Sequence, residues 1–309
     1  MPLQAARLDW REAGTPYSAE FSDVYYSAGD GLEESRYTFL AGNRLPDRWR
    51  DHPDGHFCIA ETGFGTGLNF LLTWQAWRAL DAPRPALHYL TVERFPLRKA
   101  DLQRALDAWP ELAPLARLLL RDYPPGLPGC HRLLFDEGRV RLDLHLGDAQ
   151  EVLGELAGRH TGVVDAWYLD GFAPARNAAM WSPSLLRAAA TLSRPGATFA
   201  TFTAAGDVRR ALRASGFEVS RVTGFGRKRE ALRGRFVAAG TIAHDDHITP
   251  WDIPARAPQA IASRQTSQSE ERRVEKECYA LPIGLVLILV QEGADAHTAG
   301  VENARVRLH

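Results

Sequence analysis

An apolar run that ends in an acid and passes directly into alternating glycines most constrains the fold of this chain. Residues 57–67 read FCIAETGFGTG, in which Glu61 is followed by Gly63, Gly65 and Gly67. A buried strand that turns through closely spaced glycines lets backbone approach a ligand, and the next helix begins with its N-terminus toward that ligand. The segment predicts a nucleotide-type pocket, with a glycine-rich structural turn as the alternative.

The acid distinguishes this turn from a dinucleotide-binding motif. Dinucleotide-binding folds use GxGxxG, whereas these three glycines alternate strictly and an acid precedes them by two residues. A carboxylate at this position suits the cationic methionine end of S-adenosylmethionine (SAM), whereas it would repel a pyrophosphate. The segment therefore favours SAM as the ligand.

Size, charge and cysteine usage narrow the class of protein. A chain of 309 residues allows one α/β core with an insertion or a tail. The 37 Lys and Arg against 38 Asp and Glu leave a net charge of −1, so a nucleic-acid partner would need a local basic patch. Three scattered cysteines predict no metal site, no disulfide framework and a cytoplasmic setting. The longest apolar run, 281–290, is too short to span a bilayer, so we expect a soluble protein without a membrane partner.

Short apolar runs alternate with helical patterns from about residue 57 to residue 240, which is typical of a mostly parallel sheet flanked by helices. We expect seven strands, near 57–61, 87–93, 141–146, 163–169, 197–203, 217–222 and 231–238. Helices are expected near 67–80, 98–108, 149–157, 183–192 and 206–215. The last two strands should be antiparallel at one edge, because 224–229 is too short for a crossover helix. The pattern predicts the Rossmann-like fold of SAM-dependent methyltransferases.

Three regions are expected along the chain. Residues 1–56 should form an N-terminal cap with a hairpin in 8–27, which could equally line a substrate entrance; 57–240 should form the core. Residues 241–309 are expected to be a linker and a disordered or non-native tail. Within the core, 109–139 is longer than a normal connection and predicts an insertion near the pocket, before the third strand.

Two acids follow strands where a nucleotide would bind. Glu93 closes the second strand, where a doubly wound fold places an acid for the ribose hydroxyls; a solvated strand-end acid is the alternative. Asp148 follows the third strand and could accept from an adenine amino group. It could also cap the helix that begins at Ala149, and the two roles are compatible.

A third acid, Asp170, ends the fourth strand in the sequence AWYLDGFAPARNAAMW. Open α/β sheets present catalytic groups at this end of a central strand. Phe172, Trp181 and Tyr168 offer faces against which a flat base could stack. We therefore expect methylation of an amine on a planar substrate, with Asp170 holding the ammonium and taking its proton. A structural acid or a helix cap is the alternative.

The segment 206–236 is rich in cations. It holds nine Lys and Arg against three acids. Arg227, Lys228 and Arg229 lie between the two edge strands and should be exposed, able to meet phosphates; a solvated surface is the alternative. Arg209, Arg210 and Arg213 are expected on a surface helix.

Several ordered blocks within residues 1–240 closely resemble the MnmC-type tRNA methyltransferase domain. They read FSDVYYSAGDGLEESRYTFLAGN, ETGFGTGLNFL, LDGFAPARNAAMW, TFATFTAAGDVRRAL and GFGRKREALRG. That family methylates the 5-aminomethyl group of wobble 2-thiouridine in tRNA with SAM. The resemblance implies that Asp170 lies at the aminomethyl group. It implies SAM contacts at Glu61, Gly63, Gly65, Gly67, Glu93 and Asp148.

The resemblance also sets limits. Many relatives carry a C-terminal FAD-dependent oxidoreductase, but no GxGxxG pattern follows the linker TPWDIPARAP, and the residues after about 262 suggest truncation or a changed reading frame. We therefore expect FAD in the bifunctional relatives and not in this chain. Two alternatives stay open: a SAM methyltransferase acting on a small free amine, and a tRNA-binding module made inactive by its tail.

Overall fold

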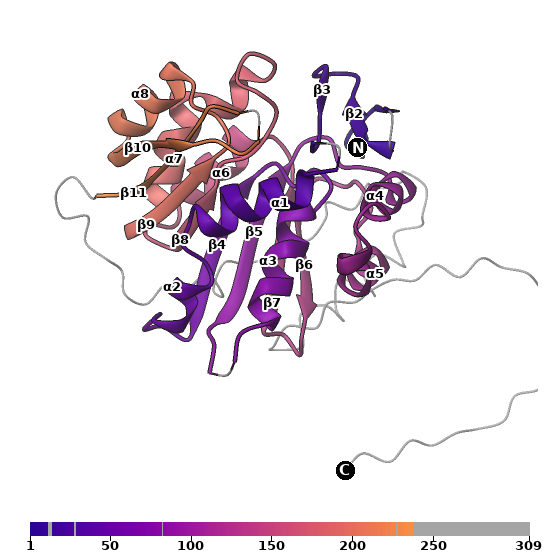
Figure 1. The fold of residues 1–309 in the computed structure, drawn as a ribbon, viewed down its shortest axis with the longest axis horizontal. Coiled ribbons are helices and arrows are strands. Elements are labelled where there is room, and N and C mark those ends of the chain that lie inside the picture. Colours follow the sequence, from indigo (N-terminus) through magenta and orange to yellow (C-terminus); the bar gives the residue numbers. More distant parts are fainter. Residues whose placement is uncertain (12–13, 28, 82, 227, 238–309) are drawn as a thin grey trace, which may run out of the picture. The chain divides into compact units, whose positions relative to one another are not determined.

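A central sheet organises the part of the chain that the structure describes. The computed structural model describes residues 1–11, 14–27, 29–81, 83–226 and 228–237; the expected tail, 241–309, lies outside them. The sheet has the strand order β10-β11-β9-β8-β4-β5-β7-β6 (Figure 1). Its strands are β4 (His56–Thr62), β5 (Ala86–Glu93), β6 (Gly129–Phe135), β7 (Val140–Leu146), β8 (Val164–Tyr168), β9 (Ser193–Thr201), β10 (Phe217–Thr223) and β11 (Glu230–Phe236).

The middle of the sheet is parallel and both edges are antiparallel. Strands β9, β8, β4, β5 and β7 pair in parallel. Strand β10 pairs antiparallel with β11, as predicted from the short connection between them, and β11 pairs antiparallel with β9. The predicted count of seven strands is wrong, because β6 adds an eighth strand, antiparallel to β7.

Alternating side chains of the strands bury two separate apolar layers. In β4, Phe57 and Ile59 belong to one core and Cys58 and Ala60 to the other, because successive strand residues point to opposite faces. Helix α3 (Leu68–Arg78) packs on the first face and contacts α1 (Gly31–Ser35) and α5 (Ala113–Asp122). The second core contains buried residues of α6 (Ala149–Ala157), α7 (Pro183–Leu192) and α8 (Gly206–Ala214). Helix α4 (Lys99–Leu106) follows β5 and contacts α5 (Figure 1).

The segment 109–139, predicted as an insertion, consists largely of regular secondary structure. It contains the short helix η3 (Pro110–Leu112), helix α5 (Ala113–Asp122) and strand β6. The apolar side of α5 buries Leu115, Ala116 and Leu119 against the first core. The segment therefore extends the sheet and covers one of its faces.

The N-terminal region forms a small sheet and a short helical segment. Strand β1 (Leu8–Trp10) pairs antiparallel with β2 (Pro16–Ser18), so the hairpin is confirmed, and β3 (Asp23–Val24) adds a third strand. Helix α1 (Gly31–Ser35), the π-helix η2 (Arg36–Ala41) and helix α2 (Asp47–Arg50) lead into β4. Within the described ranges, no helix is both long and apolar enough to cross a membrane.

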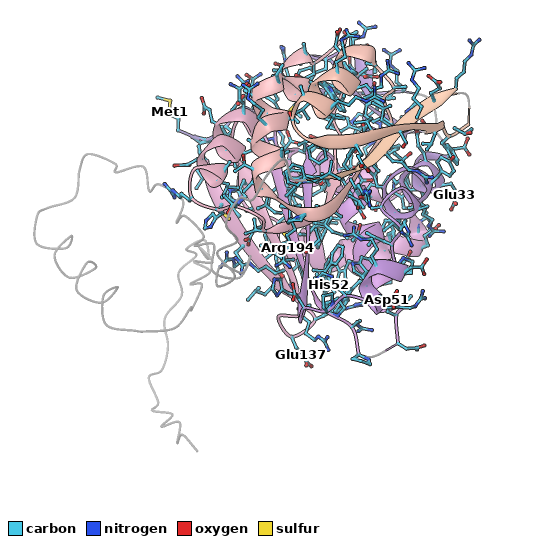
Figure 2. The ribbon with its side chains drawn as sticks, turned by 90° about the vertical axis from the view of Figure 1, so that its left-hand side faces the viewer. Met1, Glu33, Asp51, His52, Glu137 and Arg194 are labelled. Atoms are coloured by element: carbon cyan, nitrogen blue, oxygen red, sulfur yellow. The ribbon has the colours of Figure 1, made fainter. Side chains whose placement is uncertain are left out.

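The amino end of the parallel strands is closed by polar groups. Arg194 forms an ion pair with Asp54, whose carboxylate also lies 4.0 Å from His52 Nε2. Figure 2 shows Arg194 and His52 at this edge of the sheet. Buried Asp165 accepts from the Cys58 N–H at 2.8 Å and lies 3.6 Å from Arg194 Nε. The polar groups at the amino ends of these strands are therefore paired with one another.

Candidate active site

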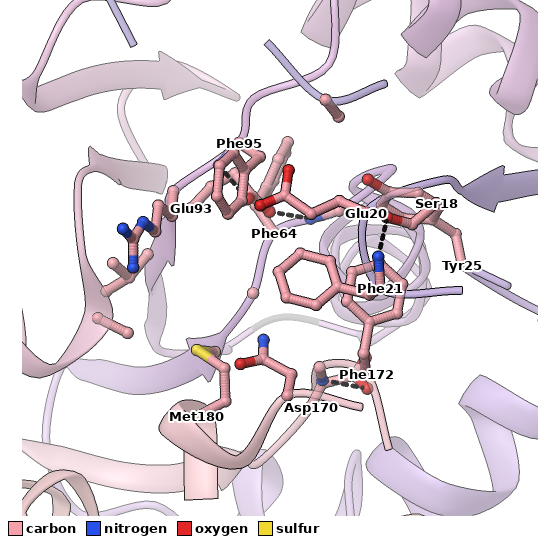
Figure 3. A pocket seen from close by; sticks show the side chains of 18 of the residues that line it. Ser18, Glu20, Phe21, Tyr25, Phe64, Glu93, Phe95, Asp170, Phe172 and Met180 are labelled. Atoms are coloured by element: carbon pink, nitrogen blue, oxygen red, sulfur yellow. Dashed lines mark hydrogen bonds between the residues drawn. The ribbon is translucent and has the colours of Figure 1, made fainter. Parts of the chain in front are cut away.

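The carboxyl ends of β4 and β8 meet where the direction of the sheet reverses. From β4 the chain proceeds to β5 on one side, and later returns to β8 on the other. Ligands of open α/β sheets bind beyond the strand ends at such a point. A cavity of about 820 Å³ lies here, lined among others by Gly63, Glu93, Asp148 and Asp170 (Figure 3). Its size is that of a small-molecule site.

The three glycines form the turn between β4 and α3, and each adopts a positive φ. Their φ values are +93° at Gly63, +53° at Gly65 and +69° at Gly67. A Cβ on Gly65 would lie 3.3 Å from the Tyr25 ring, and a Cβ on Gly67 would lie 2.8 Å from the Phe64 ring. Gly63 and Gly65 line the cavity, whereas Gly67 is the N-cap residue of α3. The turn therefore needs glycine both for its backbone conformation and for its close contacts.

Glu93, at the end of β5, anchors this turn. One oxygen of its carboxylate accepts from the Gly65 N–H at 2.9 Å, and the other accepts from the Phe95 N–H at 2.8 Å. Burial raises the pKa of Glu93, and these backbone donors oppose that rise. Because each carboxylate oxygen accepts more than one hydrogen bond, capacity for a ligand's hydroxyl groups remains.

Asp148 lies at the cavity and caps α6. Its Oδ1 accepts from the N–H groups of Gln150 and Glu151 at 2.9 and 3.3 Å, as expected for an N-cap. Its Oδ2 accepts from Arg94 at 2.9 Å. The capping role is confirmed, and a contact with adenine stays a prediction.

Asp170, two residues after β8, faces the same cavity with a carboxylate fixed on both oxygens. Its Oδ1 accepts from the Gly171 N–H at 2.8 Å, and its Oδ2 accepts from Asn69 Nδ2 at 2.7 Å. Burial raises the pKa of Asp170 to about 6, although these donors oppose the rise. A carboxylate with such a pKa is ionised at neutral pH and is a stronger base than an ordinary aspartate.

Glu61 lies behind this group and does not line the cavity. Its side chain is fully buried, and it accepts from Asn69 Nδ2 and Thr91 Oγ1, both at 2.9 Å. Burial first, and then the charge of Asp170, raise the pKa of Glu61 well above its ordinary value. Asn69 links Glu61 to Asp170, and the contact of Glu61 with SAM stays a prediction.

The aromatic residues predicted to stack on a base have different positions, and Tyr168 is fully buried in β8. Phe172 lines the cavity and stacks on Phe21, with ring centroids 4.7 Å apart, while Tyr25 meets it edge-on at 5.2 Å. Figure 3 shows Phe21 and Phe172 together beside Asp170. Trp181 is buried outside the cavity lining, and its indole N–H donates to the Phe172 carbonyl at 3.0 Å. Trp181 thus supports the loop, and its stacking on a base stays a prediction.

The predicted basic loop joins β10 and β11. Lys228 and Arg229 are exposed, as expected, whereas Arg227 lies outside the described residues. Lys228 pairs with Glu34 of α1. The predicted helical arginines do lie on one helix, α8.

Sequence reasoning did not identify Asn69 and Glu34. Asn69 is in the first turn of α3, 8 % exposed among apolar neighbours, and a polar residue there is the signal that could have found it. Glu34 had no comparable signal, because its partner Lys228 is 194 residues away in the sequence.

Comparisons with known proteins agree with this geometry. Residues 110–236 match the family model described as S-adenosyl-L-methionine-dependent methyltransferase. The tRNA 5-methylaminomethyl-2-thiouridine biosynthesis bifunctional protein MnmC of Aeromonas salmonicida (strain A449) is 52% identical over 239 residues, which are 76% of this chain and 36% of that protein. The chain thus spans about a third of the length of this curated relative.

A solved structure supports the fold. The crystal structure of MNMC2 from Aquifex aeolicus superposes with a TM-score of 0.57 at 20% identity, covering 79% of this chain and 74% of that chain. The predicted fold class and the resemblance to the MnmC-type methyltransferase domain are confirmed. The chain belongs to the S-adenosyl-L-methionine-dependent methyltransferase family.

Proposed function

We propose that this chain transfers a methyl group from SAM to the primary amine of 5-aminomethyl-2-thiouridine at the wobble position of tRNA, giving 5-methylaminomethyl-2-thiouridine. The observation that carries the proposal is the position of Asp170, whose carboxylate lines the same cavity as the glycine turn and Glu93. The identity of 52% to a protein named for the biosynthesis of that nucleoside supports the choice of substrate.

The residues of the cavity fit SAM. The glycine turn provides backbone without side chains, where a Cβ on Gly65 would approach Tyr25. Glu93 and Asp148 supply acceptors at the ends of β5 and β7, matching the hydroxyl and amino donors of a nucleoside. When bound, SAM supplies an electrophilic methyl group on a sulfonium.

Asp170 can accept the proton that the acceptor amine must lose before it attacks the methyl group. A primary alkylamine has a pKa of about 10 and is mostly protonated at neutral pH, so it has no free electron pair for attack. The Asp170 carboxylate can pair with the ammonium, orient it and take one proton onto an oxygen, leaving the neutral amine. Asn69 and the Gly171 N–H hold that carboxylate in one orientation, which favours positioning of the amine.

Exposed cations and aromatic rings support an RNA substrate. Lys228 and Arg229 lie on an exposed loop, and cations of this kind meet phosphates. Phe172 and Phe21 at the cavity offer faces for an unstacked base. We assign Arg227 to the same phosphate-binding loop from the sequence alone.

The test is methyl transfer from radiolabelled SAM to tRNA that bears 5-aminomethyl-2-thiouridine, followed by nucleoside analysis. We expect label in 5-methylaminomethyl-2-thiouridine, and none with fully modified tRNA. The free 5-aminomethyl nucleoside, tested in parallel, distinguishes a small-amine methyltransferase. Equal turnover of nucleoside and tRNA would reject the tRNA assignment, and no label despite measurable SAM binding would reject the proposed acceptor.

A further inference from the structure

One side-chain amide in the active site has an oxygen that the described residues leave without a partner. Asn69, in the first turn of α3, lines the cavity and is 8% exposed. Its Nδ2 donates to Glu61 Oε1 at 2.9 Å and to Asp170 Oδ2 at 2.7 Å, which uses both amide hydrogens. Its Oδ1 is buried and receives no hydrogen bond from the residues that the structure describes. A buried acceptor without a donor is costly, so a ligand that brings a donor would be favoured here.

The two acids determine the orientation of this amide. If the amide were turned over, Oδ1 would lie against the Asp170 carboxylate at hydrogen-bonding distance, and two acceptors would face each other. Glu61 is held in turn by the Thr91 hydroxyl, which donates to its other oxygen at 2.9 Å. The Asn69 carbonyl accepts from Thr73 Oγ1 at 2.7 Å within the same helix. Asn69 Oδ1 is therefore an acceptor held in a fixed place.

A single nitrogen can reach both Asp170 and Asn69 Oδ1. The oxygen and nitrogen of a primary amide are about 2.3 Å apart by covalent geometry. Because Asn69 Nδ2 lies 2.7 Å from Asp170 Oδ2, Asn69 Oδ1 is at most about 5 Å from that carboxylate oxygen. Two acceptors that share a tetrahedral nitrogen are about 4.7 Å apart at ordinary hydrogen-bond lengths. One amine can therefore bond to Asp170 and to Asn69 Oδ1 at the same time.

We propose that Asn69 Oδ1 accepts a hydrogen bond from the acceptor amine and, together with Asp170, limits the reaction to the transfer of one methyl group. The inference rests on the proposed function and deepens it, because it assigns the residue that sets how many methyl groups the amine receives. Asp170 takes the proton, and Asn69 orients the amine.

A primary amine satisfies both acceptors in the first transfer. Its ammonium loses one proton to Asp170, and a turn about the carbon–nitrogen bond directs the freed electron pair at the methyl carbon. The two remaining N–H groups then point to the Asp170 carboxyl group and to Asn69 Oδ1. As the nitrogen–carbon bond forms, the carbon–sulfur bond breaks and its electron pair stays on sulfur. The product is a secondary ammonium with two N–H groups.

A second transfer does not fit the same two acceptors. The secondary ammonium would have to lose a proton, which leaves one N–H group and one methyl group on the nitrogen. With the electron pair directed at a new methyl donor, the methyl group already present must point at Asp170 or at Asn69 Oδ1. That acceptor would lose its hydrogen bond and meet a carbon atom closer than carbon–oxygen contact allows. The pair therefore excludes the dimethylated product.

The test is exhaustive methylation of tRNA that bears 5-aminomethyl-2-thiouridine, with excess SAM and mass spectrometry of the nucleosides. The wild type should stop at the monomethyl nucleoside. Asn69→Ala removes Oδ1 and makes space for a methyl group, so the dimethylaminomethyl nucleoside should form. We expect the ratio of the second transfer rate to the first to rise about tenfold or more. Dimethyl nucleoside from the wild type, or none from a folded and active Asn69→Ala variant, would overturn the inference.

Thr91→Val is the matched control. It removes the hydroxyl that holds Glu61, and so disturbs the same hydrogen-bond network without removing Asn69 Oδ1. Whatever happens to its rate, its product should remain the monomethyl nucleoside. Calorimetry with Asn69→Ala identifies the amine concerned, because SAM also carries a primary ammonium. If the variant loses SAM affinity and still makes only the monomethyl nucleoside, Oδ1 binds SAM and the inference is wrong.

A binding measurement without SAM separates this inference from the proposed function. The probes are tRNAs bearing 5-aminomethyl- or 5-dimethylaminomethyl-2-thiouridine, whose ammonium groups carry three N–H groups and one. The wild type should bind the first about tenfold more tightly, and Asn69→Ala should bind both about equally, whereas a purely structural role for Asn69 would weaken both alike. The preference in a protein that methylates no tRNA would reject the function and retain the amine site. Equal binding by the wild type would overturn the inference, even if Asn69→Ala fails to fold.

Discussion

Two aspartates, Asp143 within the sheet and Asp170 just beyond the end of one of its strands, have pKa values shifted in opposite directions. Asp143, in β7, is fully buried and bonded to two guanidinium groups and an imidazole: Arg132 Nε lies at 2.8 Å, Arg141 Nη2 at 2.9 Å and His88 Nε2 at 3.0 Å. Its pKa is below the ordinary value despite the burial. Asp170, beyond the end of β8, receives hydrogen bonds from neutral donors, and burial raises its pKa to about 6.

The comparison separates a structural acid from one available for chemistry. The guanidinium groups of Arg132 and Arg141 balance the negative charge of Asp143, so this carboxylate has its ionic partners within the fold. Asp170 faces a cavity, and its directly bonded partners leave its negative charge uncompensated. A carboxylate held in this way gains from an external cation, and a substrate ammonium supplies one. Burial alone therefore does not identify the functional acid; the charge of its partners does.

The largest effect should come from removing the ionisable group at the cavity. Asp170→Asn keeps the shape of the side chain but cannot take a proton from the amine, so we expect the single-turnover rate to fall by about 10²–10⁴. SAM affinity, measured by calorimetry, should change little. A full rate in the variant at saturating SAM and tRNA would contradict the role of Asp170.

The corresponding change at the compensated acid should affect stability instead. Asp143→Ala leaves two guanidinium groups without that carboxylate, so we expect it to reduce the free energy of unfolding by about 3–5 kcal/mol. Urea unfolding measures this, and the methyl-transfer rate per folded molecule should stay close to that of the wild type. A cost below about 1 kcal/mol would mean that the cations near Asp143 find other partners readily.

The parallel core and the active-site edge could be predicted because their signals are local. The turn with Gly63, Gly65 and Gly67 and the acid Glu93 follow strands whose apolar runs are visible in the sequence. Strand β6 was not predicted, because it follows the proline- and glycine-rich stretch PPGLPG and is an edge strand without clear alternation.

Contacts between distant parts of the chain could not be predicted, because they are tertiary. The Asn69–Asp170 hydrogen bond joins residues 101 positions apart, and the Lys228–Glu34 pair spans 194 positions. Neither has a fixed spacing in the sequence. The burial of Trp181 could not be predicted for a related reason: it depends on how the loop folds back on η4 (Ala178–Trp181) and not on its neighbours in the chain.

The pKa values of Asp170 and Asp143 are shifted in opposite directions, so the two groups should make stability depend on pH in opposite ways. The rate should fall up to tenfold per pH unit below about pH 6, as Asp170 becomes protonated. Because the folded-state pKa of Asp170 lies above its unfolded value, its ionisation reduces stability as pH rises from about 4 to 6. Asp170→Asn should thus be more stable than the wild type above pH 6 and similar below pH 4.

Asp143 should show the opposite dependence of stability on pH. Because its folded-state pKa is lowered, it contributes stability above its unfolded pKa of about 3.9, and that contribution is lost as pH falls through its folded pKa. The cost of Asp143→Ala should therefore be constant between pH 5 and pH 8, as estimated from urea unfolding at several pH values. A cost that changes steeply near pH 6 would assign the titrating group to Asp143 and remove the contrast with Asp170.

The smallest effect is expected from substituting two glycines with positive φ, one at the cavity and one in a turn remote from it. Gly65 lines the cavity at φ +53°, whereas Gly138 is in the turn between β6 and β7 at φ +81°, where a Cβ would meet nothing within 4 Å. Alanine at either position should cost about 1 kcal/mol of stability, because a left-handed backbone strains a residue with a Cβ. Only Gly65→Ala should also weaken SAM binding, since its Cβ would lie 3.3 Å from the Tyr25 ring and disturb the turn that Glu93 anchors. Calorimetry with both variants decides the point: equal SAM affinities would mean that the turn tolerates a side chain, and that the cavity depends on the glycines for backbone conformation alone.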